Sequence, residues 1–287
     1  MTINAAQKER NIKLVLTFCA FSSLLFLFLI FLFILIEGLP LFFKVGVKNI
    51  IFGFKWAPTK GHFGIFPMIV SSFLVTMGAL IIGAPLGLGC ATYLSEYAGK
   101  KRRLFLKPAL ELLAGIPSVV YGFLGVIYIV PLIRDYLGGS GFSLLSTSLV
   151  LSIMILPTII SISYDSLTSV PQGYREGSLA MGATTWQTVY RVVIPSAKSG
   201  ILASFILGMG RAIGETMAVI MVAGNALKIP TGPLDPLRTL TSNIALELAY
   251  ASGDHRRALF STGVVLLVII MALNYFANFV MKRKIAR

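Results

Sequence analysis

Residues 170–195 read VPQGYREGSLAMGATTWQTVYRVVIP, and this polar stretch lies between two long apolar runs. Pro171 suits the start of a helix, and residues 174–181 predict a short helix that Gly182 ends. We expect a second short helix over 185–193, because a proline follows two residues later and helices tend to end before proline. The stretch therefore predicts two short helices joined at a glycine, which form a compact projection from the apolar part of the chain.

Most of the remaining chain consists of apolar runs. Of its 287 residues, 56% are hydrophobic and 13% are charged, whereas soluble domains carry about 25% charged residues. A membrane-spanning helix needs about 20 apolar residues. The first run is too long for a signal-peptide core and no small-residue cleavage site follows it, so we expect it to be retained. The pattern predicts an all-α membrane protein with six transmembrane helices, over residues 14–36, 67–93, 108–133, 144–163, 201–223 and 258–281.

The formal net charge of +14 would be typical of a nucleic-acid-binding protein if it gathered on one surface. The lysines and arginines lie instead in the segments between apolar runs, so we expect membrane lipid and no nucleic acid around this chain. Six spans place both termini on one side of the membrane, together with residues 100–107 and 164–200. Most of the basic residues fall on that side, which predicts that both termini are cytoplasmic.

Two charged residues, Arg211 and Glu215, lie inside the fifth apolar run. A charge at the centre of a bilayer costs about 3 kcal/mol even on lenient scales, so such residues tend to face a cavity and carry function. Arg211 is about 15 Å into this span, near the middle of the membrane. A continuous helix would place both side chains on one face, where they form either a structural ion pair or part of a site.

The functional interpretation of this pair is a pathway for an oxyanion. A guanidinium group offers a planar fork of donors that matches phosphate oxygens. A carboxylate at Glu215 would accept the O–H of monohydrogen phosphate, which sulfate lacks near neutral pH. Ser118 and Thr216 are further candidates for substrate contact, although membrane threonines also bond their own backbone. The predicted substrate pathway consists of Arg211, Glu215, Thr216 and Ser118.

The sequence predicts neither catalysis nor metal binding by this chain. Cys19 and Cys90 lie in separate apolar runs, and His62 and His255 have no Cys or His at ligand spacing. We therefore interpret both histidines as surface residues. No G-x-x-x-x-G-K-[ST] phosphate loop occurs, so ATP hydrolysis requires another polypeptide. We expect a non-enzymatic subunit that binds no metal and no cofactor of its own.

The polar stretch of residues 170–195 resembles the loop shared by ABC importer permeases. A Glu, two small residues, a Gly and a final V-x-I-P stand in register, with Glu176 first and Gly182 as the glycine. The family usually has two alanines where this chain has Gly177 and Ser178. The resemblance implies a type I ABC importer permease fold, in which a cytoplasmic coupling helix fits a groove of a separate ATPase. The residues that it assigns to ATPase coupling are Arg175, Glu176, Gly177, Ser178, Ala180 and Gly182.

A second resemblance covers nearly the whole chain. Residues 214–219 read GETMAV, residues 221–225 read MVAGN and residues 116–122 read IPSVVYG. These stretches are similar to phosphate-specific transport permeases of the PstC type, whereas the sister PstA type reads Glu-Thr-Ala-Pro. The resemblance implies half of an ATP-driven phosphate pathway in the cytoplasmic or inner membrane of a bacterium or archaeon. The implied partners are a PstA-type sister permease, a PstB-type ATPase dimer that holds ATP and Mg, and an external PstS-type phosphate-binding protein.

Two other classes of protein share some of these features. An ABC permease for molybdate, sulfate or phosphonate would have the same fold and coupling loop, but not the sequence around Glu215. A secondary transporter or channel would share the spans and the buried charges, but it would not need the loop from Glu176 to Pro195.

We expect two regions along the chain. Residues 1–66 contain the first span and the first outer segment, and residues 67–287 form a five-helix permease core with its coupling loop at 164–200. Two long outer segments, 37–66 and 224–257, mix proline, glycine and aromatic residues with charge. They are expected either to fold and receive a partner or to serve as ordinary interfacial loops.

Overall fold

The computed structural model describes residues 3–285 of the chain, with side chains over 7–275. The basic residues at 282–287, which enter the charge argument for the C-terminus, lie outside the described side chains. The first half contains α1 (Ile3–Val45), α2 (Val47–Ile51), β1 (Trp56–Ala57), the 3-10 turn η1 (Pro58–Lys60), β2 (His62–Phe63), α3 (Phe66–Thr92), the π turn η2 (Tyr93–Tyr97), α4 (Lys100–Gly115), α5 (Ser118–Leu124), the π turn η3 (Gly125–Ile129) and α6 (Val130–Leu137). The second half contains α7 (Leu144–Thr168), α8 (Gln172–Ala180), α9 (Thr185–Thr188), the π turn η4 (Val189–Val193), α10 (Ile194–Ser196), α11 (Lys198–Gly214), α12 (Met217–Val222), α13 (Leu240–Glu247) and α14 (Gly253–Ile285).

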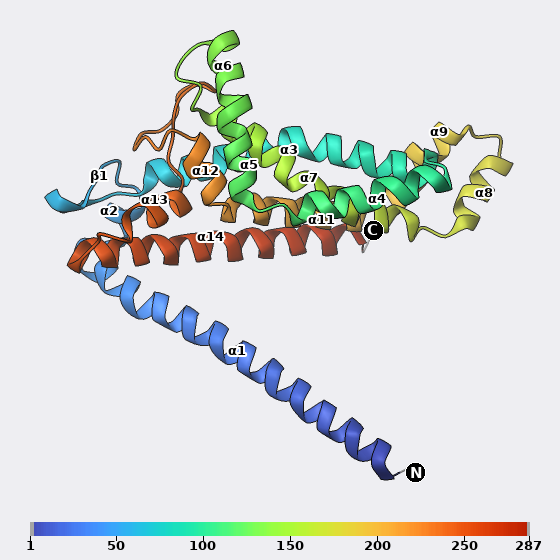
Figure 1. The fold of residues 1–287 in the computed structure, drawn as a ribbon, viewed down its shortest axis with the longest axis horizontal. Helices are drawn as coiled ribbons and strands as arrows, with labels where there is room; N and C mark the ends of the chain where they lie inside the picture. Colours follow the sequence, from blue (N-terminus) through green and yellow to red (C-terminus); the bar gives the residue numbers. More distant parts are fainter. Residues whose placement is uncertain (1–2, 286–287) are drawn as a thin grey trace.

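Helices α3, α4, α7, α11 and α14 run along one common direction (Figure 1). Helices α8 and α9 lie beyond one end of this bundle, and α2, β1 and α13 lie at the other (Figure 1). Helix α7 is the central member, because it packs against both α3 and α11. Glycines permit the close approach: a Cβ atom on Gly87 of α3 would lie 2.6 Å from Ile159 of α7, and one on Gly208 of α11 would lie 3.1 Å from the same side chain. Small residues therefore set the distances between the central helices.

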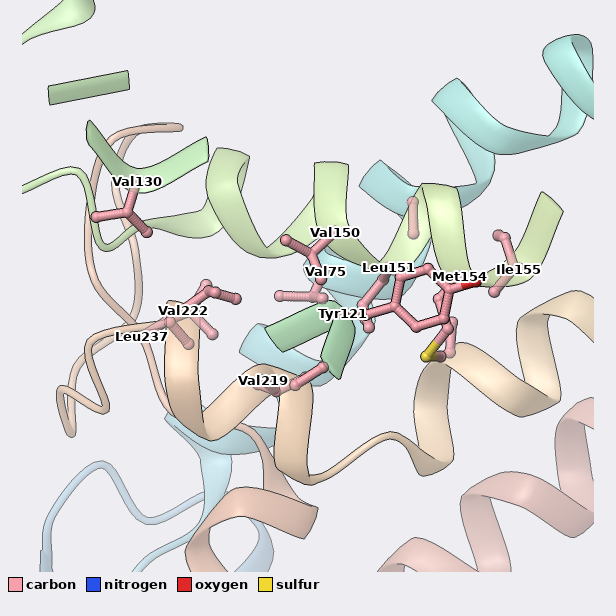
Figure 2. Packing of buried hydrophobic residues seen from close by; sticks show 14 of the residues in the cluster. Val75, Tyr121, Val130, Val150, Leu151, Met154, Ile155, Val219, Val222 and Leu237 are labelled. Carbon is pink, nitrogen blue, oxygen red and sulfur yellow. The ribbon is translucent and has the colours of Figure 1, made fainter. Parts of the chain in front are cut away.

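The main apolar core lies around α7, where several elements contribute to one cluster. Val75 of α3, Tyr121 of α5, Leu151 of α7 and Val219 of α12 converge there (Figure 2). Leu151 is fully buried and Val219 is 1% exposed. The cluster therefore holds the short helices α5 and α12 against the longer helices of the bundle.

Helix α1 diverges from the bundle and packs only near its C-terminal end (Figure 1). There Ser261 of α14 donates a hydrogen bond from Oγ to the Gly38 carbonyl at 2.7 Å. Phe33 packs edge-on against Phe260, with 5.4 Å between the ring centroids. Nearer the N-terminus the apolar side chains of α1 are exposed, Phe18 among them at 74%. This surface is suited to lipid or to another membrane chain rather than to water.

Within residues 3–285, five helices are long and apolar enough to cross a membrane. A sixth span is found if Thr185–Ser196 and Lys198–Gly214, which meet at a bend of 69°, count as one helix. Four of the six predicted spans are confirmed as continuous helices, α1, α3, α7 and α14; α3 has the predicted length, and the other three are longer than predicted. Of the other two, the third is found shifted, over Ser118–Leu137, and the fifth is broken.

The prediction of one continuous helix over 108–133 is wrong. Helix α4 already contains residues 100–107, which were expected in a loop, and it ends at Gly115. Ile116 is extended, and α5 begins after Pro117. Proline explains this break, because it lacks an N–H and drives the residue before it out of the α conformation.

The predicted fifth span, 201–223, also consists of two helices. Helix α11 ends at Gly214, Glu215 is extended, and the chain continues as the short helix α12. The prediction that Arg211 and Glu215 share one helical face is therefore wrong, because Glu215 lies outside the helix. Its side chain bonds to the first turn of α12 instead, which favours a new helix start at this point.

The first helix of the coupling loop (residues 164–200) is confirmed as α8. Gly182 has a φ of +83°, a conformation in which glycine is strongly preferred. Its N–H donates to the Leu179 carbonyl at 2.9 Å, and the Ala183 N–H donates to the Ser178 carbonyl at 3.2 Å. These two bonds are the Schellman motif that ends many helices.

The second helix of the coupling loop begins as predicted but ends later. Thr184 and Gln187 form a capping box before α9. The helix was expected to stop before Pro195, but it widens into the π turn η4 and continues through Pro195 as α10. Pro195 is interior to this continued helix, where it has no N–H to donate, and the wider turn η4 ends two residues before it.

The contact between α3 and α7 gives a test of the packing. Gly87→Ala is expected to destabilise the detergent-solubilised protein by about 1–3 kcal/mol, because the added Cβ overlaps Ile159. Gly89→Ala in the same helix is the matched control, since no atom lies within 4 Å of its Cβ position. There the higher helix propensity of alanine should leave the Tm unchanged or raise it. Equal Tm values for the two variants would show that the contact between Gly87 and Ile159 accommodates an added methyl group without loss of stability.

Candidate functional site

The two broken spans have the same geometry at their breaks. Ile116 has φ −67° and ψ 128°, and Glu215 has φ −69° and ψ 134°. Beyond the breaks α5 and α12 pack directly, since a Cβ atom on Gly122 would lie 2.9 Å from Ala218 Cα. Interrupted helices in membrane proteins are found where backbone lines a cavity or a substrate path. We therefore place the candidate substrate site at these two breaks.

A tyrosine compensates the first break. Pro117 has no N–H, so the Leu113 carbonyl loses the donor that a continuous helix would provide and keeps a longer backbone bond from the Ile116 N–H, at 3.3 Å. The Tyr121 hydroxyl donates a hydrogen bond to this carbonyl at 2.7 Å, and Tyr121 is only 7% exposed. Ser118 is the first residue of α5, and its half-buried hydroxyl has no protein hydrogen bond within the described residues. That hydroxyl is therefore available to a ligand at the break.

A carboxylate compensates the second break. Glu215 Oε1 accepts a hydrogen bond from the Ala218 N–H at 3.1 Å, as a helix cap does. The Glu215 carbonyl accepts one from Thr241 Oγ1 at 2.8 Å, so α13 helps to hold the extended residue. Thr216 Oγ1 donates to the Gly214 carbonyl at 3.3 Å. In this structure the threonine hydroxyl thus bonds to nearby backbone, the second of the two roles that the sequence left open for it. The second carboxylate oxygen of Glu215 accepts no hydrogen bond from the described part of the protein.

Arg211 lies one helical turn before the second break and does not pair with Glu215. Its Nη1 donates to Thr158 Oγ1 of α7 at 3.2 Å. Among the residues with described side chains, none forms a salt bridge with Arg211. The structural ion pair between Arg211 and Glu215 is therefore absent from this conformation. A guanidinium with several free donors inside a span is suited to bind an anion.

The residues predicted for ATPase coupling divide into two groups. Four of them are exposed on α8 and the turn after it: Glu176, Gly177, Ala180 and Gly182. Ser178 is half-buried, and its hydroxyl lies 2.9 Å from the Thr188 hydroxyl, which ties α8 to α9. The exposed group is the part of the set that a partner can reach directly.

Arg175 points away from the exposed face of α8. Its guanidinium donates two hydrogen bonds to the Glu96 carboxylate, at 3.0 and 2.8 Å. The hydrogen bond with Glu96 raises the pKa of Arg175 above its ordinary value. Glu96 is not predicted from the sequence, because it stands 79 positions from Arg175 and an isolated Glu carries no pairing signal. Arg175 therefore anchors the coupling loop and does not belong to its exposed surface.

The two outer segments are folded around a buried carboxylate, Glu247 of α13. It accepts hydrogen bonds from Trp56 Nε1 at 2.8 Å and from Arg238 Nη1 at 2.7 Å. His255 Nε2 lies 2.8 Å from the same carboxylate, and the His255 side chain is 17% exposed. The prediction that His255 is a surface residue is wrong, because Glu247 holds it in this network. Both segments thus form one ordered cap instead of separate loops.

The loop between α12 and α13 is ordered by a second carboxylate, Asp235. The Thr231 hydroxyl and N–H donate to it at 2.6 and 2.8 Å, and the Gly232 N–H donates at 3.1 Å. These hydrogen bonds lower the pKa of Asp235 to about 2. The loop also accepts a hydrogen bond from the Leu144 N–H at 2.9 Å, which fixes it to the start of α7.

Residues 83–286 match the family model described as the binding-protein-dependent transport system inner membrane component. The chain belongs to this family. A probable ABC transporter permease protein of Bacillus subtilis, YqgH, is 40% identical over 277 residues, which cover 93% of this chain and 90% of the relative. The phosphate transport system permease protein PstC of Pasteurella multocida is 36% identical over 234 residues, which cover 75% of this chain and 73% of that protein.

Solved structures share the fold. A chain of a bacterial ABC transporter for import of the acidic polysaccharide alginate gives a TM-score of 0.67 at 18% identity, covering 93% of this chain and 95% of that one. A chain of the inward-facing MetNI methionine ABC transporter gives 0.59 at 18% identity, covering 80% and 99%. The predicted type I ABC importer permease fold is confirmed. This multi-pass chain is the membrane component of an importer, whose ATPase and substrate-binding protein are separate subunits.

The bond across the first break gives a test of this site. Tyr121→Phe keeps the ring but leaves the Leu113 carbonyl with only the longer bond from the Ile116 N–H, at 3.3 Å, so we expect a loss of about 0.5–1.5 kcal/mol in stability. Thermal unfolding of the purified complex measures the change. Tyr128→Phe is the matched control, because that tyrosine lies in η3 and is 66% exposed. Unfolding of Tyr121→Phe at the wild-type temperature would mean that the hydroxyl does not support the break.

Proposed function

We propose that this chain is the permease subunit of an ATP-driven importer of inorganic phosphate, and that Arg211, Glu215, Thr216 and Ser118 line its half of the pathway. The observation that carries the proposal is the Arg211 guanidinium, which lies inside a span close to a helix break and has one hydrogen-bond partner among the described residues. The identity of 32% to 36% to relatives named as PstC phosphate transport permeases supports phosphate as the cargo.

The site residues act on different parts of the ion. Arg211 donates its free N–H groups to phosphate oxygens and offsets their negative charge. Glu215 accepts the O–H of monohydrogen phosphate with the oxygen that Ala218 does not use. Sulfate near neutral pH has no such O–H, so the carboxylate repels it. The Ser118 hydroxyl, at the other break, donates a further hydrogen bond. Selectivity then follows from one cation and one acceptor held at fixed positions.

The same proposal assigns the partners. A PstB-type ATPase dimer, which holds ATP and Mg, docks on the exposed residues of α8, and this chain binds no cofactor itself. A PstA-type sister permease supplies the other half of the pathway. A PstS-type phosphate-binding protein docks on the outer cap around Glu247, and both termini lie in the cytoplasm with the coupling loop. Residues 67–287 form the permease core, to which residues 1–66 add a peripheral helix and part of the cap.

Arg211→Gln tests the assigned cation. In vesicles that contain the complete complex, we expect ATP-dependent uptake of radiolabelled phosphate to fall about tenfold or more, because a hydrogen bond to a charged group contributes about 1.5–3 kcal/mol. Basal ATP hydrolysis should persist. Arg134→Gln is the control, since that side chain is 55% exposed on α6 and pairs with Asp135. Normal uptake by Arg211→Gln would remove Arg211 from the pathway.

Competition between oxyanions tests the cargo and the role of Glu215. For the wild-type complex, excess arsenate should suppress uptake of labelled phosphate and excess sulfate should not. Glu215→Gln keeps an oxygen that can accept the Ala218 N–H but removes the charge, so we expect the preference for phosphate over sulfate to fall about tenfold. Strong competition by sulfate in the wild type would point to another oxyanion as the cargo. An unchanged preference in the variant would exclude Glu215 from selectivity.

A further inference from the structure

Two arginines from different helices meet the same short turn at the coupling-loop end of the bundle. This turn is η2, the single π turn that follows α3. It is closed by a hydrogen bond from the Ala98 N–H to the Tyr93 carbonyl at 2.8 Å. Arg175 reaches it from α8, and Arg103 reaches it from α4. π turns are rare in proteins, and many of those known lie at functional sites. The meeting of two arginines at η2 therefore suggests a functional role for this turn.

The link from α8 is a bidentate ion pair with little exposure. The side chains of Arg175 and Glu96 are 14% and 8% exposed. The same guanidinium donates to the Leu167 carbonyl at 2.9 Å, in the last turn of α7, and to the Val170 carbonyl at 2.7 Å, two residues after that helix. None of the residues of α8 is buried, so apolar packing does not hold this helix on the bundle. Arg175 is therefore a principal attachment of α8 to the spans.

The link from α4 uses backbone acceptors of the same turn. Arg103 donates from Nε to the Leu94 carbonyl at 3.1 Å and from Nη2 to the Ser95 carbonyl at 2.9 Å. Carbonyls at the end of a helix lack partners within the helix, and a guanidinium satisfies them with charge-assisted bonds. The start of α4 is thus fixed to η2 on the side of the turn that precedes Glu96.

Helix α4 carries this attachment to the substrate site. It has 16 residues and is about 24 Å long, since each helical residue rises about 1.5 Å. One end is bonded to η2, and the other end is the break at Ile116, next to Ser118. A displacement of η2 is therefore transmitted through one continuous helix to the first break.

We infer that η2 is the joint through which the coupling loop moves the substrate pathway. Movement of α8 passes to η2 through Arg175 and Glu96, and from η2 to α4 through Arg103. These three are positioning residues, because they act through the backbone and do not touch the substrate. The inference uses the proposed docking of an ATPase on α8, but it does not depend on which oxyanion is carried.

The test follows the accessibility of the first break and needs no cargo. A Ser118→Cys reporter is placed in a Cys19→Ser, Cys90→Ser background, in the complete complex with its sister permease and ATPase subunits. The rate of maleimide labelling is measured with and without trapping by ATP and vanadate. We expect trapping to change the labelling rate several-fold. This response should be lost in Glu96→Gln and in Arg175→Gln, while ATP hydrolysis continues.

Two further variants separate transmission from simple anchoring. Arg103→Gln should lose the same response, although Arg103 belongs to α4 and not to α8. The Glu96→Gln, Arg175→Gln double variant should be no worse than either single one, because both residues belong to one link. Arg191→Gln is the matched control, since Arg191 lies exposed in η4 of the same loop and has no side-chain bond within the described residues.

Three results would overturn the inference. The first is a normal response in Glu96→Gln or in Arg103→Gln. The second is an additive effect in the double variant. The third is loss of the ATPase subunits from the purified variant complex, which would make the ion pair a docking element; the milder Arg175→Lys is measured beside it. If the wild-type complex changes its labelling rate on trapping but takes up no phosphate, the inference about η2 stands and the proposal of phosphate as the cargo is wrong. The two proposals can therefore fail separately.

Discussion

Every backbone N–H and C=O inside a bilayer must find a partner within the protein, because hydrocarbon offers none. A helix meets this condition by itself, whereas an interrupted helix does not. The two interruptions here are compensated by side chains: the Tyr121 hydroxyl serves the Leu113 carbonyl, and the Glu215 carboxylate serves the Ala218 N–H. The candidate site exists because these polar side chains make extended backbone tolerable inside the spans.

The arginines of the chain divide into structural and functional ones by the partners that they have. Arg175 and Arg238 each have a carboxylate partner in a poorly exposed pair, at 2.8 and 2.7 Å. Arg103 is bonded to helix-end carbonyls. Arg211 has a single hydroxyl partner among the described residues, although it lies in a span. A cation in that setting is stabilised best by an anion that the protein does not itself provide.

The sequence predicts those features that local chemistry controls. The apolar runs predict the spans, because the length of a run is read directly from the sequence. Gly182 predicts the end of α8, because glycine is the residue that most readily adopts the positive φ found there. The break after Pro117 has a local cause, but a proline inside an apolar run is also compatible with a kinked continuous helix. The break at Glu215 has no such marker, so helical spacing wrongly placed Arg211 and Glu215 on one face. Glu96 and Glu247 depend on partners far away in the chain, and no pattern in one sequence pairs them.

The outer cap and the coupling loop each contain one of the two tryptophans of the chain. Trp56 is 7% exposed and bonded to Glu247, whereas Trp186 is 65% exposed and stacks on Tyr190. The elements that carry them, β1 and α9, lie at opposite ends of the bundle (Figure 1). The tryptophan fluorescence of this subunit is therefore the sum of a shielded emitter and a solvent-accessible one. A soluble quencher reduces the emission of Trp186, at the coupling-loop end. The emission that remains comes from Trp56 and reports on the opposite end of the bundle without any added label.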